Sequence, residues 1–408
     1  MRIAVVGAGV GGLVTAACLA REGVRCEVFE WAGGPPEVAG GIQISPNGAR
    51  ILHRLGLEPE LRAVAARPVV RELRRWRDGR LIGRVGLGTA ARERYGAPYY
   101  TLRRTDLSHM LLRAAGPVRF GQRCVGVDES ASGVRLSFAG GGWYDADVVV
   151  GADGLHSVVR RALATDPPRF AGHTVYRALV PADRLPWPAG PPRVTVWLGP
   201  GQHCVSYPVG GSNAVNVVAT VAATSPPEGY AIGDAGRLAE AYQGWHPRVR
   251  ELLAAGPLVH HGLFDRPPPR HWQRGRIALV GDAAHPMLPF LAQGATQAIE
   301  DAATLAAHLR DPEGLARYEA LRRPRVERVL AAVREGADWL HLPDGPRQRD
   351  RDRRLASARL SDQDWLYGWD HPSPQCTRME PFDADPDDRA VPDADAGAPA
   401  SRSGGVAC

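Results

Sequence analysis

The sequence contains no lysine: apart from histidine, all 50 basic side chains in its 408 residues are arginine. This absence excludes a Schiff-base lysine, a phosphate-binding loop that ends in Gly-Lys-Ser or Gly-Lys-Thr, and any reaction that depends on a lysine ammonium. Residues 371–408 carry a net charge of −4 and the remainder +10, which gives the overall +6. Since arginine alternates with aspartate and glutamate nearly everywhere, this charge indicates a solvated mixed surface and no nucleic-acid partner.

Two further patterns are missing. The six cysteines lie at positions 18, 26, 124, 204, 376 and 408, without a C-x-x-C pair or metal-ligand spacing. This distribution is typical of a reduced cytoplasmic enzyme, and it predicts neither a disulfide framework nor a metal site. No apolar run reaches 18 residues, so we expect a cytoplasmic protein with no membrane partner.

The chain alternates between segments with two kinds of hydrophobic pattern. Residues 1–30 read as a buried strand, a glycine turn, an amphipathic helix and a second strand, which together predict a parallel βαβ unit. Apolar runs at 148–150 and 277–280 each lead into another turn and helix. Between them, residues 170–223 carry short alternating runs separated by proline and glycine, which predict an antiparallel sheet. We therefore expect an α/β nucleotide-binding domain interleaved with a β-rich domain.

The C-terminal part has two segments of different character. Residues 315–342 have helical periodicity, although Pro324 should kink or divide that helix. From residue 371 the composition shifts to Asp, Pro, Ala, Ser and Gly with few apolar residues. Such a segment cannot bury enough apolar surface to fold, so we expect a disordered acidic tail over 371–408.

The first turn carries a dinucleotide-binding fingerprint. It comprises Gly7, Gly9 and Gly12, with Val10 and Gly11 between them. These glycines allow a tight turn, a close approach to a pyrophosphate and tight helix packing, and Glu30 at the end of the next strand could accept hydrogen bonds from a ribose diol. A Gly-rich structural turn is the alternative. The residues alone do not choose FAD over NAD, but Glu30 disfavours a 2′-phosphate at this position.

Three motifs in order carry a family resemblance: the fingerprint, GADG at 151–154 and GDAAHP at 281–286. With GGIQISPNGARILHRLGL and LRRTDLSHML, the chain resembles the single-component FAD-dependent aromatic hydroxylases (group A flavoprotein monooxygenases) over about residues 1–345. The nearest likeness is to the salicylate hydroxylase, 3-hydroxybenzoate 6-hydroxylase and 6-hydroxynicotinate 3-monooxygenase group.

The resemblance implies a p-hydroxybenzoate-hydroxylase-like α/β fold, in which a Rossmann-type FAD-binding domain is interleaved with a β-sheet substrate domain and followed by C-terminal helices. The implied division is 1–70, 100–165 and 270–315 for the FAD-binding domain, 71–99 and 166–269 for the substrate domain, 316–370 for the C-terminal helical segment and 371–408 for the disordered tail. A monomer or homodimer is expected.

The resemblance also implies the residues that bind FAD. Asp282 would accept from the ribityl chain, and the helix that starts at Gln293, Gly294 and Ala295 would aim its N-terminus at the flavin, where its dipole stabilises negative charge. Further implied contacts are Arg103 with FAD, Val125 with adenine, Gly41 and Ile42 beside the flavin, and Asp153 near the pyrophosphate and nicotinamide. The alternatives are a helix N-cap for Asp282, a surface charge for Arg103 and a structural turn for Asp153. The family often has glycine where this chain has Ala292.

The substrate pocket is expected around one strand. His203 and Tyr207 are four residues apart in HCVSYPV, which places both side chains on one face. Hydroxylation needs an electron-rich ring, and histidine can take a phenol proton near pH 7; the alternative is a satisfied buried polar pair. In VYRAL, Tyr176 and Arg177 face opposite ways. The resemblance implies that Arg177 binds a phenolate or carboxylate, with a structural ion pair as the alternative.

The same cavity would include Gln293, as a hydrogen-bonding partner of the substrate, and Pro289, as its wall. With the resemblance, these residues predict a monooxygenase that hydroxylates a small phenolic or carboxylated aromatic compound. The resemblance implies bound FAD, transient NAD(P)H and O₂, and oxygen transfer through a flavin C4a-hydroperoxide. The alternatives are an epoxidase or a hydroxylase of a larger polycyclic substrate and, in other classes, an NAD-dependent dehydrogenase or a non-enzymatic flavin-binding protein. A flavin halogenase would need a lysine, which the chain lacks.

Overall fold

A six-stranded sheet carries the glycine turn. The computed structural model describes residues 1–35, 40–187, 190–211 and 213–370, so the predicted disorder of the acidic tail lies outside the described residues. The strand order is β18 (Gln273–Arg274), β19 (Ile277–Leu279), β11 (Val148–Gly151), β1 (Ile3–Val6), β2 (Cys26–Phe29) and β7 (Val118–Arg119). All neighbours are parallel except β18 and β19. The predicted βαβ unit is confirmed, and the apolar runs at 148–150 and 277–280 extend the same sheet.

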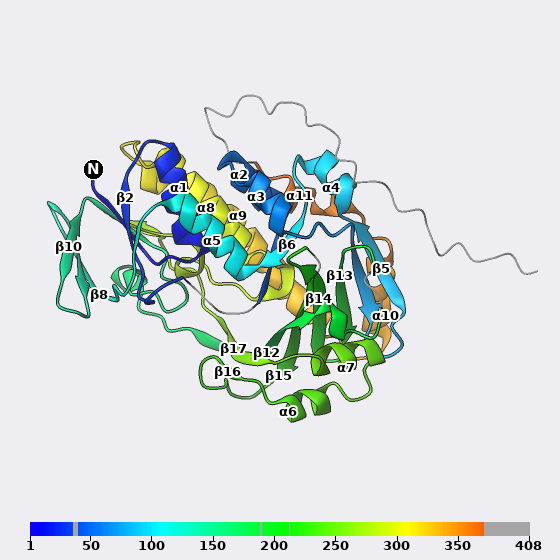
Figure 1. Ribbon diagram of the computed structural model, residues 1–408. Helices are drawn as coiled ribbons and strands as arrows, with labels where there is room; N and C mark the ends of the chain where they lie inside the picture. The colour runs from blue at the N-terminus through cyan, green and yellow to red at the C-terminus, as the bar shows by residue number, and fades with distance from the viewer. Residues whose placement is uncertain (36–39, 188–189, 212, 371–408) are drawn as a thin grey trace, which may run out of the picture. The chain divides into compact units, whose positions relative to one another are not determined.

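Four helices lie side by side over this region (Figure 1): α1 (Val10–Arg21), α5 (Arg104–Ala115), α8 (Gly294–His308) and α9 (Gly314–Leu340). Helix α9 runs unbroken through Pro324, so the expected division of this helix does not occur. Arg322 and Arg325, on either side of the proline, both bind carboxylates of α8. These contacts hold both halves of α9 against one neighbour, which offsets the hydrogen bond that proline removes.

A second sheet has eight strands. Their order is β16 (Ala231–Ile232), β17 (Val259–Asp265), β12 (Arg169–Pro181), β15 (Ala214–Ala222), β14 (Gln202–Val209), β13 (Arg193–Gly199), β4 (Val70–Arg75) and β5 (Leu81–Gly86). Only β13 and β4 pair in parallel, which confirms the antiparallel sheet predicted for residues 170–223. The sheet draws on two separated chain segments, as an interleaved fold requires; the domain boundaries themselves stay a prediction.

The two faces of the eight-stranded sheet differ. One face contributes Tyr176, Trp197 and Cys204 to a core cluster with α6 (Ala235–Ala241) and α7 (Pro247–Ala254). The opposite face presents Arg177, His203 and Tyr207 to a cavity. The period of two along β12 and β14 therefore separates core residues from cavity residues, as predicted for Tyr176 and Arg177.

The remaining elements complete the described chain. The smaller sheets are β10 (Trp143–Ala146), β9 (Gly133–Phe138) and β8 (Cys124–Ser130), and β3 (Gly41–Ile44) with β6 (Tyr100–Arg103). The other helices are α2 (Pro46–Arg54), α3 (Glu58–Val64), α4 (Gly88–Tyr95), α10 (Pro346–Ala356) and α11 (Asp364–Tyr367), with 3₁₀ turns at Val159–Ala162, Ala182–Arg184, Gly281–Ala283, Pro289–Leu291 and Leu360–Gln363. Among the helices of the described chain, none has the length and apolar character needed to cross a membrane.

A buried ionic cluster joins α8 to α9. Arg322 Nε donates to Asp301 Oδ1 at 2.8 Å and its Nη1 binds Glu300, while Arg325 Nε donates to Glu300 Oε2 at 2.6 Å. Asp301 also lies 2.6 Å from His285 Nε2. Burial alone would raise the pKa of Asp301, but His285 and Arg322 lower it to about 2. The charges are therefore mutually neutralised inside the protein.

Candidate active site

A cavity of about 330 Å³ lies where the two sheets approach each other. Its walls come from the glycine turn before α1, from β3, from the turns before α8 and from the cavity face of β12, β14 and β15. Predicted FAD-site residues and predicted substrate-site residues therefore line one space. Among the residues that the structure describes, no cluster of three or more His, Cys, Asp or Glu could hold a metal ion.

The glycine turn has the shape that a pyrophosphate requires. Gly7 adopts a φ of +105°, and a Cβ added there would lie 2.4 Å from the carbonyl oxygen of Ala152. A Cβ added to Gly12 would lie 1.9 Å from the Gly7 oxygen, whereas one added to Gly9 would meet nothing within 4 Å. Gly7 and Gly12 thus allow the close packing. Gly9, Val10 and Gly11 line the cavity, where the N-terminus of α1 has no side-chain cap.

Two of the predicted carboxylates hold backbone turns at this site. Glu30 accepts from the backbone nitrogens of Ala8 at 2.7 Å and Ala32 at 2.9 Å. Asp153 accepts from the Ser157 hydroxyl and from the backbone nitrogens of Val158 and Val159. The residues on either side of Asp153 line the cavity but Asp153 does not, so its contacts support the structural alternative. A ribose contact of Glu30 stays a prediction, since a carboxylate has further lone pairs.

The turns before α8 form the other half of the cradle. Asp282, Pro289, Gly294 and Ala295 line the cavity. Asp282 caps no helix, which disfavours the alternative reading, and withdrawal from bulk water raises the pKa of its carboxyl group. An FAD pyrophosphate needs hydrogen-bond donors, which the uncapped helix N-terminus and the glycine turn before α1 offer. The ribityl chain needs an acceptor, which the Asp282 carboxylate offers. The residues present therefore fit FAD.

Arg103, Val125 and Gln293 also lie outside the lining of this cavity. Arg103 pairs with Asp106 at 3.0 Å, whereas its neighbour Arg104 lines the cavity. Val125 is 50% exposed and lies outside the lining of the cavity. The side chain of Gln293 is buried, where its amide nitrogen donates to the Ser45 hydroxyl at 2.9 Å. The prediction that Gln293 contacts substrate is therefore not supported, because its amide group already bonds within the protein; FAD contacts of Arg103 and Val125 stay predictions.

His203 and Tyr207 both line the cavity from β14, as their spacing predicted. His203 Nδ1 lies 2.8 Å from Nε2 of His341 and 3.1 Å from the Thr220 hydroxyl. Burial, and then the neighbouring His341 and His173, lower the pKa of His203 to about 3. Burial raises the pKa of Tyr207 to about 12, although Arg177 and Arg104 oppose the shift. At neutral pH the site thus holds a neutral imidazole and a protonated phenol.

Arg177 is the cation of this cavity face. Its Nε lies 3.4 Å from His261 Nε2, and it makes no ion pair with a carboxylate of the described chain. Burial lowers the pKa of its guanidinium. The structural ion pair considered for Arg177 is therefore not found, and an uncompensated cation faces the cavity.

The sequence reasoning missed His341 and Arg104. His341 follows the end of α9, 138 residues after His203, and no spacing connects the two. Arg104 is adjacent to Arg103 at the junction of β6 and α5. Only the exact position of that junction decides which arginine faces the cavity.

Ala292 stands at the position where the family often has glycine. It is the one non-glycine residue in the described chain with a positive φ, +52°. We expect Ala292→Gly to leave the free energy of unfolding unchanged or to raise it by up to about 1 kcal/mol, because relief of the left-handed conformation offsets the added chain entropy. As a control, Ala303→Gly within α8 should lower it by about 1 kcal/mol. Urea denaturation of both variants tests this; equal losses would contradict it.

Comparison with known proteins shows to which family this chain belongs. Residues 1–333 match the family described as FAD binding domain. The chain belongs to this family. A 3-amino-4-hydroxybenzoate 2-monooxygenase of Streptomyces platensis is 49% identical over 382 residues, which cover 90% of this chain and 96% of that protein. A 6-hydroxynicotinate 3-monooxygenase of Bordetella bronchiseptica is 35% identical over 391 residues, which cover 90% and 95%.

A solved structure gives the same result for the fold. HpxO of Klebsiella pneumoniae, complexed with FAD and uric acid, superposes with a TM-score of 0.79 at 28% identity, covering 89% of this chain and 94% of that one. The family and fold expected from the three motifs are confirmed. This chain is thus an FAD-dependent monooxygenase, neither an NAD-dependent dehydrogenase nor a flavin-binding protein without activity.

Proposed function

We propose that this monooxygenase hydroxylates a small phenol that carries a ring carboxylate, with 3-amino-4-hydroxybenzoate as the first candidate. The observation that carries the proposal is the unpaired guanidinium of Arg177 in the cavity. Burying a cation without a counterion is costly, and a substrate carboxylate would remove that cost. The 49% identical relative is named for a substrate of this kind, which supports the choice.

In this proposal His203 accepts the phenol proton at Nε2, which makes no hydrogen bond within the described chain. For Nε2 to be free, Nδ1 must carry the proton and donate to His341 Nε2. A proton taken up at Nε2 can then leave through Nδ1 to His341 and away from the substrate. Deprotonation makes the ring electron-rich, and the anionic substrate favours the charged imidazole that burial otherwise disfavours.

Tyr207 and the cofactor site complete the arrangement. The Tyr207 phenol stays protonated at neutral pH and offers a hydrogen-bond donor to the substrate. Gly9 to Gly11, Asp282, Gly294 and Ala295 would hold FAD. When bound and reduced by NAD(P)H, FAD would activate O₂, so that one oxygen atom is transferred to the ring and the other leaves as water.

Replacing Arg177 by Met tests the substrate class. We expect kcat/KM for 3-amino-4-hydroxybenzoate to fall by about 10- to 100-fold, because a hydrogen bond to a charged group contributes about 1.5–3 kcal/mol. For 2-aminophenol, which lacks the carboxylate, the wild type and Arg177→Met should differ little. Steady-state NAD(P)H oxidation with product analysis measures both. Arg135→Met, which removes an exposed arginine paired with Asp145, should change neither value.

Two results would contradict the proposed substrate class. Turnover of polycyclic phenols with no turnover of any hydroxybenzoate or aminohydroxybenzoate would favour the alternative of a larger substrate. An equal loss with both 2-aminophenol and 3-amino-4-hydroxybenzoate in Arg177→Met would show that the guanidinium does not bind the carboxylate.

The buried His203 also predicts how stability depends on pH. Its folded-state pKa of about 3 lies below the ordinary value of 6.5, so the unfolded chain binds an extra proton between these values. The free energy of unfolding should therefore fall as pH decreases below about 6.5. Replacing His203 by Gln should lessen the loss between pH 7 and pH 5 by about 2 kcal/mol. Urea denaturation at the two pH values measures this, with exposed His109→Gln as the control; parallel curves for wild type and His203→Gln would contradict it.

A further inference from the structure

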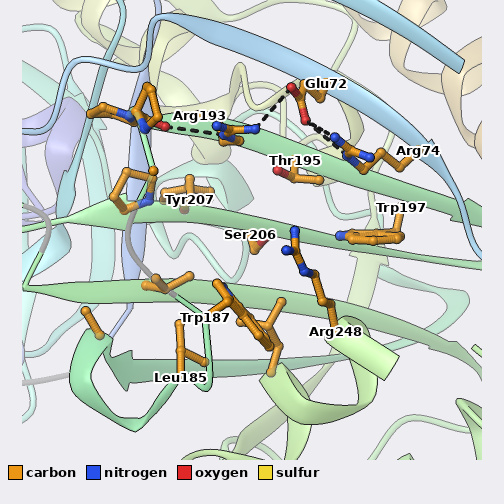
Figure 2. A pocket seen from close by; sticks show the side chains of 17 residues that line it. Glu72, Arg74, Leu185, Trp187, Arg193, Thr195, Trp197, Ser206, Tyr207 and Arg248 are labelled. Atoms are coloured by element: carbon orange, nitrogen blue, oxygen red, sulfur yellow. Dashed lines mark hydrogen bonds and ion pairs between the residues drawn. The ribbon is translucent and has the colours of Figure 1, made fainter. Parts of the chain in front are cut away.

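A second cavity, of about 380 Å³, lies on the other side of the eight-stranded sheet. Figure 2 shows it between the strands, the residues that lead into β13 and the start of α7. Thr195 and Trp197 of β13 face it together with Ser206 of β14, which alternates with the His203 and Tyr207 positions. None of these three side chains takes part in the proposed hydroxylation, although Tyr207, which does, also borders this space. We call this space the outer pocket.

The outer pocket contains an unpartnered buried donor. The side chain of Trp197 is 4% exposed, and its indole nitrogen has no hydrogen-bond partner in the described chain. In Figure 2 that nitrogen points toward Ser206 and the guanidinium of Arg248. The hydroxyl groups of Ser206 and Thr195 belong to the lining of the same pocket. A buried N–H group without an acceptor is rare, and a ligand with an acceptor atom would satisfy it.

The charge of the pocket favours an anion. Glu72 is its only carboxylate, and both oxygens are engaged: Arg74 donates to it at 2.8 Å and Arg193 at 3.3 Å. Arg248 enters from α7 and makes no ion pair with a described carboxylate. The lining thus contains three guanidinium groups and one carboxylate, so it carries a net positive charge. Arg248, Trp197 and Ser206 all line this pocket, so these three can donate to the same acceptor group.

The pocket also has an aromatic wall. Trp187 lines it, with the Arg248 guanidinium 5.5 Å from its ring centroid. Leu185 and Leu252 add apolar surface. A ring can pack on this wall while a carboxylate attached to it reaches the donors, and an aliphatic acid would gain only the second contact.

We propose that the outer pocket is a second binding site for a small aromatic carboxylate, separate from the cavity that contains Arg177. The carboxylate is bound by Arg248, the indole N–H of Trp197 and the hydroxyl of Ser206, and the ring packs against Trp187. The ligand belongs to the same chemical class as the proposed substrate, so it is either that compound or a different aromatic acid. The binding site itself does not depend on turnover.

Calorimetry of the FAD-loaded protein with benzoate tests the proposal, because two sites should be seen. Arg248→Met should weaken one site at least tenfold and leave the other unchanged. Arg177→Met should affect only the other site. Ser206→Ala should weaken the outer site as well. Arg250→Met should change neither site, because Arg250 is exposed like Arg248 and lies on the same helix but does not line the pocket. If Arg248→Met and Ser206→Ala both leave benzoate binding unchanged, the outer pocket does not bind it.

Titrations with further ligands test which chemical groups the outer site requires and which aromatic acid it prefers. Acetate and benzamide should bind the outer site at least tenfold more weakly than benzoate, since the first lacks the ring and the second the charge. Equal binding of either would contradict an aromatic carboxylate site. Titration of Arg177→Met with 3-amino-4-hydroxybenzoate and with benzoate then shows whether the outer site prefers the proposed substrate or another aromatic acid. The Arg177 experiment can fail while the Arg248 experiment succeeds, so failure of the proposed function is distinguishable from failure of this site.

Discussion

His203→Gln is expected to lower kcat for hydroxylation of 3-amino-4-hydroxybenzoate by about 10²- to 10⁴-fold, the range for loss of a general base. Glutamine keeps a polar side chain of similar length but cannot take up the phenol proton at neutral pH. His203 faces the cavity, and its other ring nitrogen already bonds His341 at 2.8 Å. The loss should shrink as pH rises, because an increasing fraction of the bound substrate is then already ionised.

The measurement is kcat for product formation between pH 6 and pH 10, with FAD content checked by flavin absorbance. FAD binding should be unchanged, since the predicted cofactor residues lie on other elements of the cavity. Arg135→Met again serves as the distant control. A kcat for His203→Gln within threefold of the wild type would remove His203 from the proton transfer. A large loss that does not change with pH would assign it a role other than deprotonation.

Replacing Arg322 by Leu is expected to lower the free energy of unfolding by about 3–5 kcal/mol, the usual cost of removing one partner of a buried ion pair. Arg322 is fully buried and bonds both Glu300 and Asp301, which are fully buried themselves. The substitution would leave the negative charges of these two buried carboxylates only partly neutralised. Because Asp301 also bonds His285 next to the Asp282 turn, FAD affinity should fall together with stability.

Urea denaturation of the FAD-loaded protein measures this effect. The matched control is the next arginine, Arg323, whose salt bridges with Glu319 and Glu327 are partly exposed. Arg323→Leu should cost less than about 1 kcal/mol, as surface ion pairs do. Similar losses for Arg322→Leu and Arg323→Leu would show that the buried cluster contributes no more than a surface pair.

The sequence predicts the features that depend on local pattern. The glycine spacing predicts the turn at Gly7 to Gly12, and the alternation in HCVSYPV predicts that His203 and Tyr207 share a face. Both follow from the geometry of a few consecutive residues. Pro324 shows the limit of such reasoning, because contacts of its neighbours with α8 outweigh the local preference against a proline inside a helix.

Features that depend on distant contacts could not be predicted. His341 reaches His203 across 138 residues, and Gln293 turns into a buried polar group with Ser45 instead of the cavity. The outer pocket assembles Trp197, Ser206 and Arg248 from three elements with no shared spacing. In each case the side chain's role is set by which elements pack together, and a short sequence window does not contain that information.

The most direct test of the central claim is hydroxylation under ¹⁸O₂. The FAD-loaded protein is supplied with NAD(P)H and 3-amino-4-hydroxybenzoate, and the product is examined by mass spectrometry. We expect a hydroxylated product that contains one ¹⁸O atom, with one NAD(P)H consumed per product molecule. NAD(P)H oxidation without labelled product, across the hydroxybenzoates, aminohydroxybenzoates and hydroxynicotinates, would contradict the proposed function.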